Sequence, residues 1–180
     1  MGLRDYQLEA FDAATREFKA GKRRIVLVAP TGAGKTVIGC EFVRRISARG
    51  GRVLWLAHRR ELIRQAAERR VREGLTDLHV CAASGMVGHP SAPITVASVG
   101  TLHARGHAPR ADVVVWDECH HTVARTFRDI ADKYPTAVHL GLTATPERAD
   151  KKPLGDVFDS MVVVASYKRL IDAGHLCPID

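Results

Sequence analysis

Short apolar runs, rich in β-branched residues, alternate along the chain with longer amphipathic stretches. Several of the runs are apolar at consecutive positions, which is typical of parallel strands that are covered on both faces. The expected strands are Arg24–Ala29, Arg52–Ala57, Leu78–Ala82, Ile94–Ala97, Val113–Trp116, Val138–Leu142 and Met161–Val164.

The stretches between these runs carry apolar residues at helical spacing. Phe11, Ala14 and Phe18 fall on one helical stripe, and similar stripes follow within residues 38–46 and 62–71. Strands that alternate with helices of this length predict a three-layer α/β domain with a mostly parallel central sheet.

Glycine and proline residues cluster within residues 84–93, so this segment is expected to be a surface loop, as is the segment 105–110. Neither segment is long enough to link two domains. We therefore expect the 180 residues to form one domain that covers residues 1–180.

Hydrophobic residues make up 46% of the chain and charged residues 26%, which indicates a globular domain and excludes a disordered or fibrous one. No apolar run approaches the ~20 residues that span a bilayer, and the N-terminus lacks the apolar core of a secretory signal. We expect a soluble, cytoplasmic protein with no membrane partner. The formal net charge of +7 favours a polyanionic partner, above all a nucleic acid.

A glycine-rich turn follows the first expected strand, where residues 29–36 read Ala-Pro-Thr-Gly-Ala-Gly-Lys-Thr. Gly32 and Gly34 can adopt backbone angles that are closed to other residues, which lets backbone amides approach phosphate oxygens. Lys35 can then reach the β- and γ-phosphates, and the Thr36 hydroxyl can hold Mg²⁺. The candidate nucleotide-binding residues of this turn are Thr31, Gly32, Ala33, Gly34, Lys35 and Thr36.

Another apolar strand ends in two adjacent carboxylates, Asp117 and Glu118. Adjacent carboxylates repel each other unless a cation compensates them, which favours a metal-binding role over a plain surface turn. Asp117 is expected to hold Mg²⁺ together with Thr36, and Glu118 is expected to orient or deprotonate an attacking water.

Cys119, His120 and His121 follow the acidic pair directly. Contiguous side chains cannot easily wrap one tetrahedral zinc ion, and the four cysteines of the chain lie far apart without a CxxC pair. We expect His120 to be a polar coupling residue, and we assign no role to His121.

Six segments resemble, in order and spacing, the motifs of superfamily 2 helicases and translocases. They are Leu3–Gln7 (Q motif), Ala29–Thr36 (motif I), Leu56–Gln65 (motif Ia), Ala97–Leu102 (motif Ib), Asp117–His120 (motif II, in its DECH form) and Gly141–Pro146 (motif III). Alanine at the first position of motif I, as in Ala29, is common in that superfamily. Residues 155–159 and 170–178 are most similar to its DNA-directed branch, which holds type III restriction subunits and repair helicases of the XPB and RadD groups.

The resemblance implies the first RecA-like domain of a P-loop ATPase that uses ATP and Mg²⁺ and drives nucleic-acid translocation or unwinding. It implies catalytic roles for Lys35, Asp117, Glu118 and His120. Gln7 would read the adenine edge, and Arg4 would pack on the adenine ring. Thr143 and Thr145 would couple the nucleotide site to strand movement.

Four residues just after expected strand ends are candidate contacts to a nucleic-acid backbone: His58, Arg59, Ser98 and Thr101. Ligands of open parallel sheets bind beyond the carboxyl ends of the strands. Contacts to phosphates position a strand without reading its sequence. The resemblance favours DNA over RNA as the partner.

The motifs end at motif III, and the chain ends at Asp180. We therefore expect the second RecA-like lobe of the superfamily, with its arginine finger, to be absent from this chain and to be supplied in cis or in trans. An isolated first lobe would hydrolyse ATP weakly or not at all. Two other interpretations stay open: a P-loop kinase or metabolic ATPase, which does not need motifs Ia and Ib, and a non-catalytic nucleotide- or DNA-binding remnant of a motor.

Overall fold

The computed structural model describes residues 2–57, 78–82, 85–87, 89, 91–105, 109–122, 124–147 and 153–177. The α-helices are α1 (Asp5–Lys19), α2 (Lys35–Ser47), α4 (Val99–Arg105), α5 (Ala124–Ala131) and α6 (Tyr167–Asp172). The strands are β1 (Arg24–Val28), β2 (Val53–Ala57), β3 (Leu78–Ala82), β4 (Gly85–Val87), β5 (Ile94–Ser98), β6 (Val113–Asp117), β7 (Val138–Thr143) and β8 (Ser160–Val163). Two short 3₁₀ helices are η1 (Cys119–His121) and η2 (Leu154–Asp156). None of the helices in this described part of the chain is long and apolar enough to cross a bilayer.

The strands of the described residues form one sheet in the order β4-β3-β5-β2-β6-β7-β1-β8. Every neighbouring pair is parallel except β3 and β4, which run antiparallel. The predicted α/β class with a mostly parallel sheet is confirmed, and a strand lies at each of the predicted positions.

The segment 84–93 is not a loop throughout, so that part of the sequence prediction is wrong. Gly85–Val87 forms β4, and its pairing with β3 places Val87 opposite Val80 and Met86 opposite Cys81. A strand of three residues is too short to show the alternation that identifies strands, and the glycine and proline residues around it predicted a turn. Pairing with the edge of β3 provides hydrogen bonds that local composition does not reveal.

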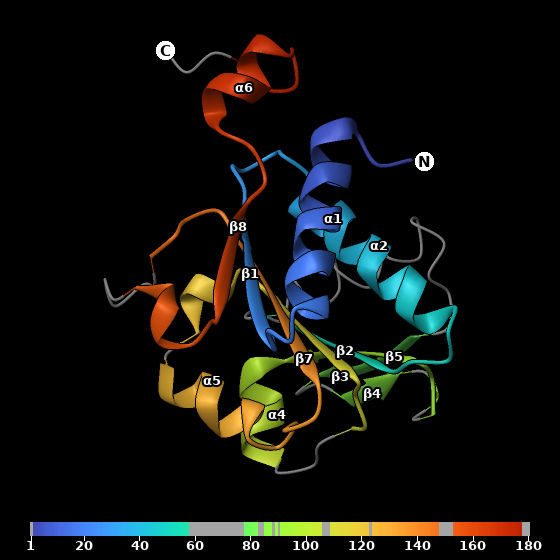
Figure 1. Ribbon diagram of the computed structural model, residues 1–180. Coiled ribbons are helices and arrows are strands. Elements are labelled where there is room, and N and C mark those ends of the chain that lie inside the picture. The colour runs from blue at the N-terminus through green and yellow to red at the C-terminus, as the bar shows by residue number, and fades with distance from the viewer. Residues whose placement is uncertain are drawn as a thin grey trace.

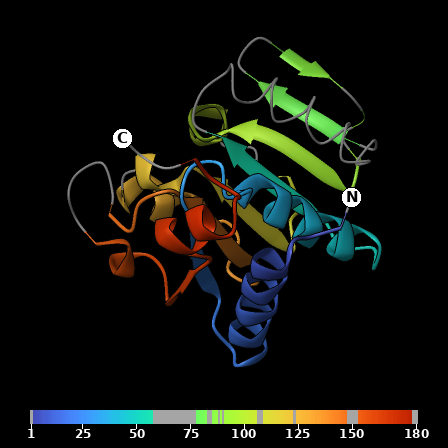
Figure 2. The same cartoon turned by 90° about the horizontal axis from the view of Figure 1, so that it is seen from above.

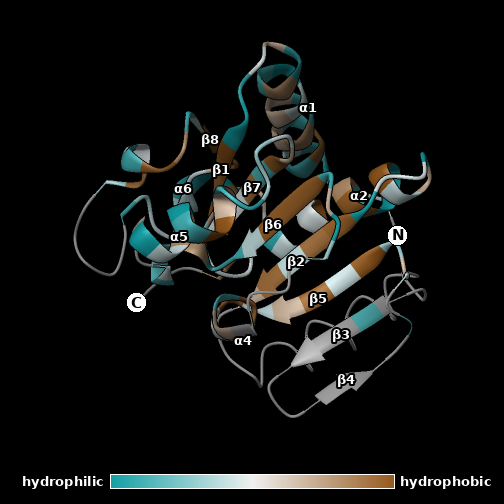
Figure 3. Cartoon of the chain, turned by 90° about the horizontal axis from the view of Figure 1, so that it is seen from below, coloured by the Kyte–Doolittle hydropathy of each residue, from teal (hydrophilic) through white to brown (hydrophobic). Residues whose placement is uncertain are grey.

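Two hydrophobic cores lie on opposite faces of the sheet. Side chains alternate between the faces along each strand, so in β1 Ile25 and Leu27 join one core while Val26 and Val28 join the other. Helices α1 and α2 cover the first face, and α4 and α5 cover the second (Figure 1). Figure 3 shows that the apolar residues are concentrated in the central strands, including β1, β6 and β2.

Helix α6 lies close to the start of α1, as the view from above shows (Figure 2). Leu170 is fully buried in the first core, and the Arg169 guanidinium donates two hydrogen bonds of 2.9 Å to the carboxylate of Glu9 in α1. Exposed ion pairs of this kind contribute little stability, so the buried leucine is the main anchor of α6. This packing places the end of the described chain next to the turn between β1 and α2, where Leu176 lies beside Gly32.

Candidate functional site

Three neighbouring strands end at the same edge of the sheet. β7 pairs in parallel with both β1 and β6, so the carboxyl ends of all three lie side by side. The glycine-rich turn follows β1, the acidic pair Asp117 and Glu118 stands at the end of β6, and Thr143 ends β7. The topology thus brings together candidate residues that are far apart in the sequence.

The turn between β1 and α2 depends on two glycines in the left-handed region. Gly32 has φ +86° and Gly34, which precedes the first residue of α2, has φ +83°. A Cβ on Gly34 would collide with the Gln7 side chain, and a Cβ on Gly32 would lie 2.9 Å from Leu176 Cδ2. The left-handed backbone therefore favours glycine at both positions, and an added Cβ would also displace the end of the Gln7 or Leu176 side chain.

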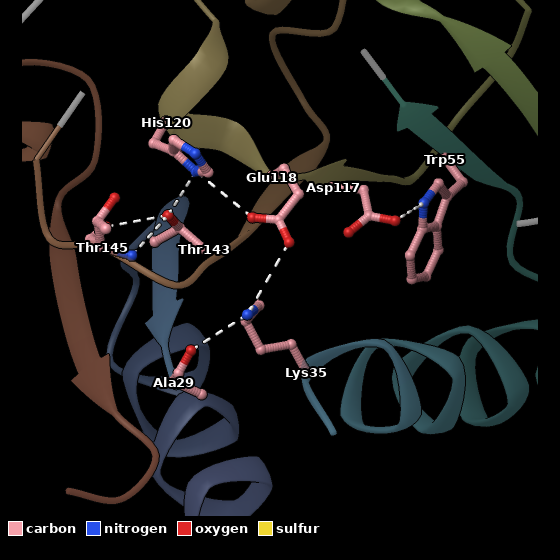
Figure 4. A network of polar contacts seen from close by, with 8 residues as sticks. All are labelled: Ala29, Lys35, Trp55, Asp117, Glu118, His120, Thr143 and Thr145. Carbon is pink, nitrogen blue, oxygen red and sulfur yellow. Dashed lines mark hydrogen bonds and ion pairs between the residues drawn. The ribbon is translucent and has the colours of Figure 1, made fainter. Parts of the chain in front are cut away.

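Lys35 joins the turn to the acidic pair (Figure 4). Its side chain is only 8% exposed, and Nζ donates a hydrogen bond of 3.2 Å to the carbonyl oxygen of Ala29. Nζ also lies 3.9 Å from Glu118 Oε1. The ammonium group is therefore held between the backbone of the turn and the carboxylate, and Thr36 follows it as the second residue of α2.

The acidic pair has unusual backbone and side-chain surroundings. Glu118 has φ +48°, and among the described residues no other non-glycine residue has a positive φ. Its Oε2 atom is buried and accepts no hydrogen bond, although it lies 3.4 Å from His120 Nδ1. Asp117 Oδ2 accepts a hydrogen bond of 3.3 Å from Trp55 Nε1. Backbone strain and a buried oxygen without a hydrogen bond are features of functional sites.

A polar chain connects Glu118 to the end of β7. Thr143 Oγ1 lies 2.9 Å from His120 Nδ1, donates to the Thr145 carbonyl oxygen at 2.9 Å and accepts from Thr145 N at 3.2 Å. Because the hydroxyl proton is used on Thr145, His120 Nδ1 must be the donor to Thr143. The same N–H then faces Glu118 Oε2, so the carboxylate, the imidazole and the two threonines form one connected unit.

The start of α1 is hydrogen-bonded to the glycine-rich turn. Gln7 is 5% exposed, its Nε2 donates to the Ala33 carbonyl oxygen at 3.1 Å, and its Oε1 accepts from Arg4 N at 3.0 Å. The Tyr6 hydroxyl donates to the same carbonyl at 3.0 Å. The Gln7 amide therefore supports the turn directly, in addition to the adenine contact that the sequence predicts for it.

Arg4 lines a pocket of about 370 Å³ between the start of α1 and α6. Tyr6, Arg169 and His175 also line it, and the rings of Tyr6 and His175 lie 5.3 Å apart. Because Tyr6 also contacts the glycine-rich turn, the pocket adjoins the turn that could hold phosphates.

The residues present fit a phosphate chain with a magnesium ion. Left-handed glycines before a helix start give a concave set of amides for phosphate oxygens, and Lys35 adds a buried cation. A carboxylate and a hydroxyl, from Asp117 and Thr36, are the oxygen donors that Mg²⁺ prefers. Burial, reinforced by the negative charge of Glu118, raises the pKa of the Cys119 thiol, and the side chain packs in the second hydrophobic core.

Residues 1–148 match the family model described as type III restriction enzyme, res subunit. The chain belongs to this family. It is 34% identical to a candidate ATP-dependent helicase, IRC3, of Saccharomyces cerevisiae, over 97% of this chain and 28% of that protein. It is 30% identical to the DNA 3'-5' translocase XPB2 of Sulfurisphaera tokodaii, over 94% of this chain and 36% of that protein. This member of the res subunit family thus spans only about a third of the length of each of these relatives.

A solved structure shares the fold of this res subunit family member. The UvsW helicase of bacteriophage T4 superposes with a TM-score of 0.77 over 91% of this chain and 60% of that chain, at 19% sequence identity. The RecA-like α/β fold predicted from the motifs is thereby confirmed.

The candidate nucleic-acid residues of motif Ib lie at the junction of β5 and α4. Ser98 Oγ accepts a hydrogen bond of 2.9 Å from Thr101 N and donates one of 2.6 Å to Thr101 Oγ1, and both residues are less than 9% exposed. Ser98 is therefore an N-terminal cap of α4, and the two hydroxyls face each other. His58 and Arg59 lie outside the described residues.

Sequence reasoning missed Tyr6 and Trp55 as parts of the site in this res subunit family member. Tyr6 precedes Gln7, and Trp55 lies in an apolar strand, where tryptophan is ordinarily a core residue. The one available signal was chemical: a buried indole N–H or phenol O–H requires an acceptor. Which acceptor each group finds depends on contacts across 27 and 62 residues of sequence.

Proposed function

We propose that this chain is the ATP-binding lobe of a DNA-dependent motor ATPase, which hydrolyses ATP with Mg²⁺ when a second RecA-like lobe completes the site. The observation that supports this most directly is the position of Lys35 Nζ, 3.2 Å from the Ala29 carbonyl oxygen and 3.9 Å from Glu118 Oε1. One ammonium group thus joins the phosphate-binding turn to the group that would act on water.

The glycine-rich turn and the acidic pair would have different roles in binding the nucleotide. Backbone amides of residues 31–36 would cradle the phosphates, and Lys35 would move from the Ala29 carbonyl to the β- and γ-phosphate oxygens. Thr36 and Asp117 would hold Mg²⁺, which neutralises charge that develops on the phosphates. Arg4 and the pocket that it lines would receive the adenine, next to Gln7.

Glu118 is the residue that we assign to the attacking water. Its Oε1 atom faces Lys35 Nζ, the cation expected at the γ-phosphate, so this oxygen is placed to accept a hydrogen bond from a water molecule in line with that phosphate. His120 and Thr143 connect that carboxylate to the residues after β7, which gives a direct route from the state of the nucleotide to the movement of the following segment.

We propose DNA as the partner and a second lobe, in cis or in trans, as the other half of the motor. The similarity to a DNA translocase supports DNA, and the net charge of +7 favours a polyanion. His58, Arg59, Ser98 and Thr101 stay our candidate contacts to the backbone. We assign residues 1–180 to one ATP-binding domain.

ATP turnover with and without DNA tests this proposal against its two rivals. The full chain is assayed alone and fused to the second lobe of a relative, and DNA is expected to stimulate turnover in the fusion only. Turnover that is indifferent to DNA in both forms would indicate a P-loop kinase or metabolic ATPase. Binding of nucleotide or DNA without ATP turnover in either form would indicate a non-catalytic remnant of a motor.

A further inference from the structure

Trp55 lies between helix α2, which carries Thr36, and the end of β6, which carries Asp117. It is fully buried in the middle of β2, next to β6 in the sheet, and its register partner there is Val115. Its Nε1–H donates to Asp117 Oδ2 at 3.3 Å (Figure 4). A buried indole N–H is costly without an acceptor, so this contact favours the orientation of the Asp117 carboxylate in which Oδ2 accepts from Trp55.

The other end of the indole packs against the helix that carries Lys35. A Cβ built on Gly39 of α2 would lie 2.7 Å from Trp55 Cη2 and 2.8 Å from Leu142 Cδ1. Because residue 39 has no side chain, the ring can occupy this space. Trp55 therefore contacts α2 with its six-membered ring and Asp117 with its N–H.

We propose that Trp55 is a positioning residue for magnesium: it fixes Asp117 through Oδ2 and so presents the other carboxylate oxygen to a nucleotide-bound Mg²⁺. Figure 4 shows that this second oxygen of Asp117 points away from Trp55, towards the side where Glu118 and Lys35 lie. The inference rests on the proposed function, because it assumes that Asp117 holds the ion. It adds a residue outside the six motif segments to the metal site.

Trp55→Phe removes the N–H and keeps an aromatic ring. We expect it to raise the Mg²⁺ concentration needed for tight binding of a fluorescent ADP analogue by roughly three- to tenfold, the range for net loss of one hydrogen bond. Binding of the same analogue in EDTA should not change, since the phosphate-binding turn is intact. A purely structural role would weaken binding equally in both conditions.

Trp116→Phe is the matched control, because Trp116 is the second of the two tryptophans and lies one residue before Asp117. It is also buried, and its Nε1 donates to a buried side chain, His139 Nδ1, at 3.1 Å on the other face of the sheet. Its loss should leave the magnesium dependence unchanged. In this variant Trp55 is the sole tryptophan, and its fluorescence should change with the same magnesium midpoint as nucleotide binding.

A second substitution keeps the test decisive if Trp55→Phe folds poorly. Replacing Trp55 by 3-benzothienylalanine exchanges the N–H for sulfur at nearly constant shape, and it should shift the magnesium midpoint as Trp55→Phe does. A midpoint equal to that of the wild type in either folded variant would overturn the role of Trp55. A wild-type protein that binds the nucleotide without any effect of Mg²⁺ would instead overturn the assignment of Asp117 to the metal.

Discussion

Glu118 has a strained backbone conformation at the centre of the proposed site. A residue with a Cβ at φ +48° is strained by about 1 kcal/mol or more, and the strain persists only when neighbouring contacts fix it. At this site it places the carboxylate between Lys35 Nζ and His120 Nδ1. The strain is thus linked to the position of one functional group.

Glu118→Gln tests the role of that carboxylate. In a motor completed by a second lobe, we expect nucleotide binding to change less than about threefold, while turnover falls by roughly 100-fold or more, because the amide is a poor base for the attacking water. Binding is measured by calorimetry and turnover by phosphate release. Asp132→Asn, which alters an exposed carboxylate after α5, should change neither value. Turnover at the wild-type rate in Glu118→Gln would show that another group activates the water.

At this site the sequence predicted most of the residues that take part, but not all of the hydrogen bonds between them. The motif resemblance assigned roles at one nucleotide site to Lys35, Glu118, His120 and Thr143, and the structure brings these side chains together at the carboxyl ends of parallel strands. The hydrogen bonds from Gln7 to the turn and from Trp55 to Asp117 were not predictable. They depend on the final angles of side chains that approach from separate elements.

At the scale of elements, the apolar runs predicted each strand of the parallel part of the sheet, because burial on both faces leaves a strong signal in the sequence. β4 was missed because its place depends on the edge of β3 and not on its own three residues. Helix α1 shows the same limit. Its apolar stripe predicts a helix, but the hydrogen bonds from its first turn to the glycine-rich turn are visible only in the structure.

Strand β7 gives the fold a predicted pH dependence through His139. Burial between β6 and α5, reinforced by the nearby charge of Arg24, lowers the pKa of His139 to about 4 from its usual 6.5. As the pH falls from about 6.5 to about 4, this histidine binds a proton in the unfolded chain but not in the folded one. The free energy of unfolding therefore falls by on the order of 3 kcal/mol over that window. Above pH 7 this group has no effect on the pH dependence of stability.

Urea unfolding at several pH values checks this expectation. His139→Gln keeps an acceptor for the Trp116 N–H but cannot titrate, so its midpoint should fall less steeply below pH 6.5 than that of the wild type. His103→Gln, which removes an exposed imidazole on α4, should retain the wild-type slope. An unchanged slope in His139→Gln would mean that other groups cause the acid sensitivity.

At the scale of the whole molecule, our proposal makes this RecA-like lobe one half of a motor. Unwinding requires two lobes that close on ATP and step as they open, so we expect the isolated chain to show no strand displacement. Its binding to single-stranded DNA should be weak and should fall steeply between 50 and 200 mM salt, since phosphate contacts dominate such binding. Fluorescence anisotropy of a labelled oligonucleotide measures this. ATP-driven strand displacement by the chain alone would refute the half-motor account.

The most direct measurement is the affinity of the full chain for ATP·Mg²⁺ by isothermal titration calorimetry, for the wild type and for Lys35→Ala. Loss of a buried cation that contacts phosphates should weaken binding by roughly tenfold or more, whereas Lys133→Ala, at an exposed lysine after α5, should bind as the wild type does. We predict a clear one-site isotherm for the wild type and the control, and a weak or absent one for Lys35→Ala. Equal affinity in all three proteins, or no binding by the wild type, would contradict the assignment of this site to ATP.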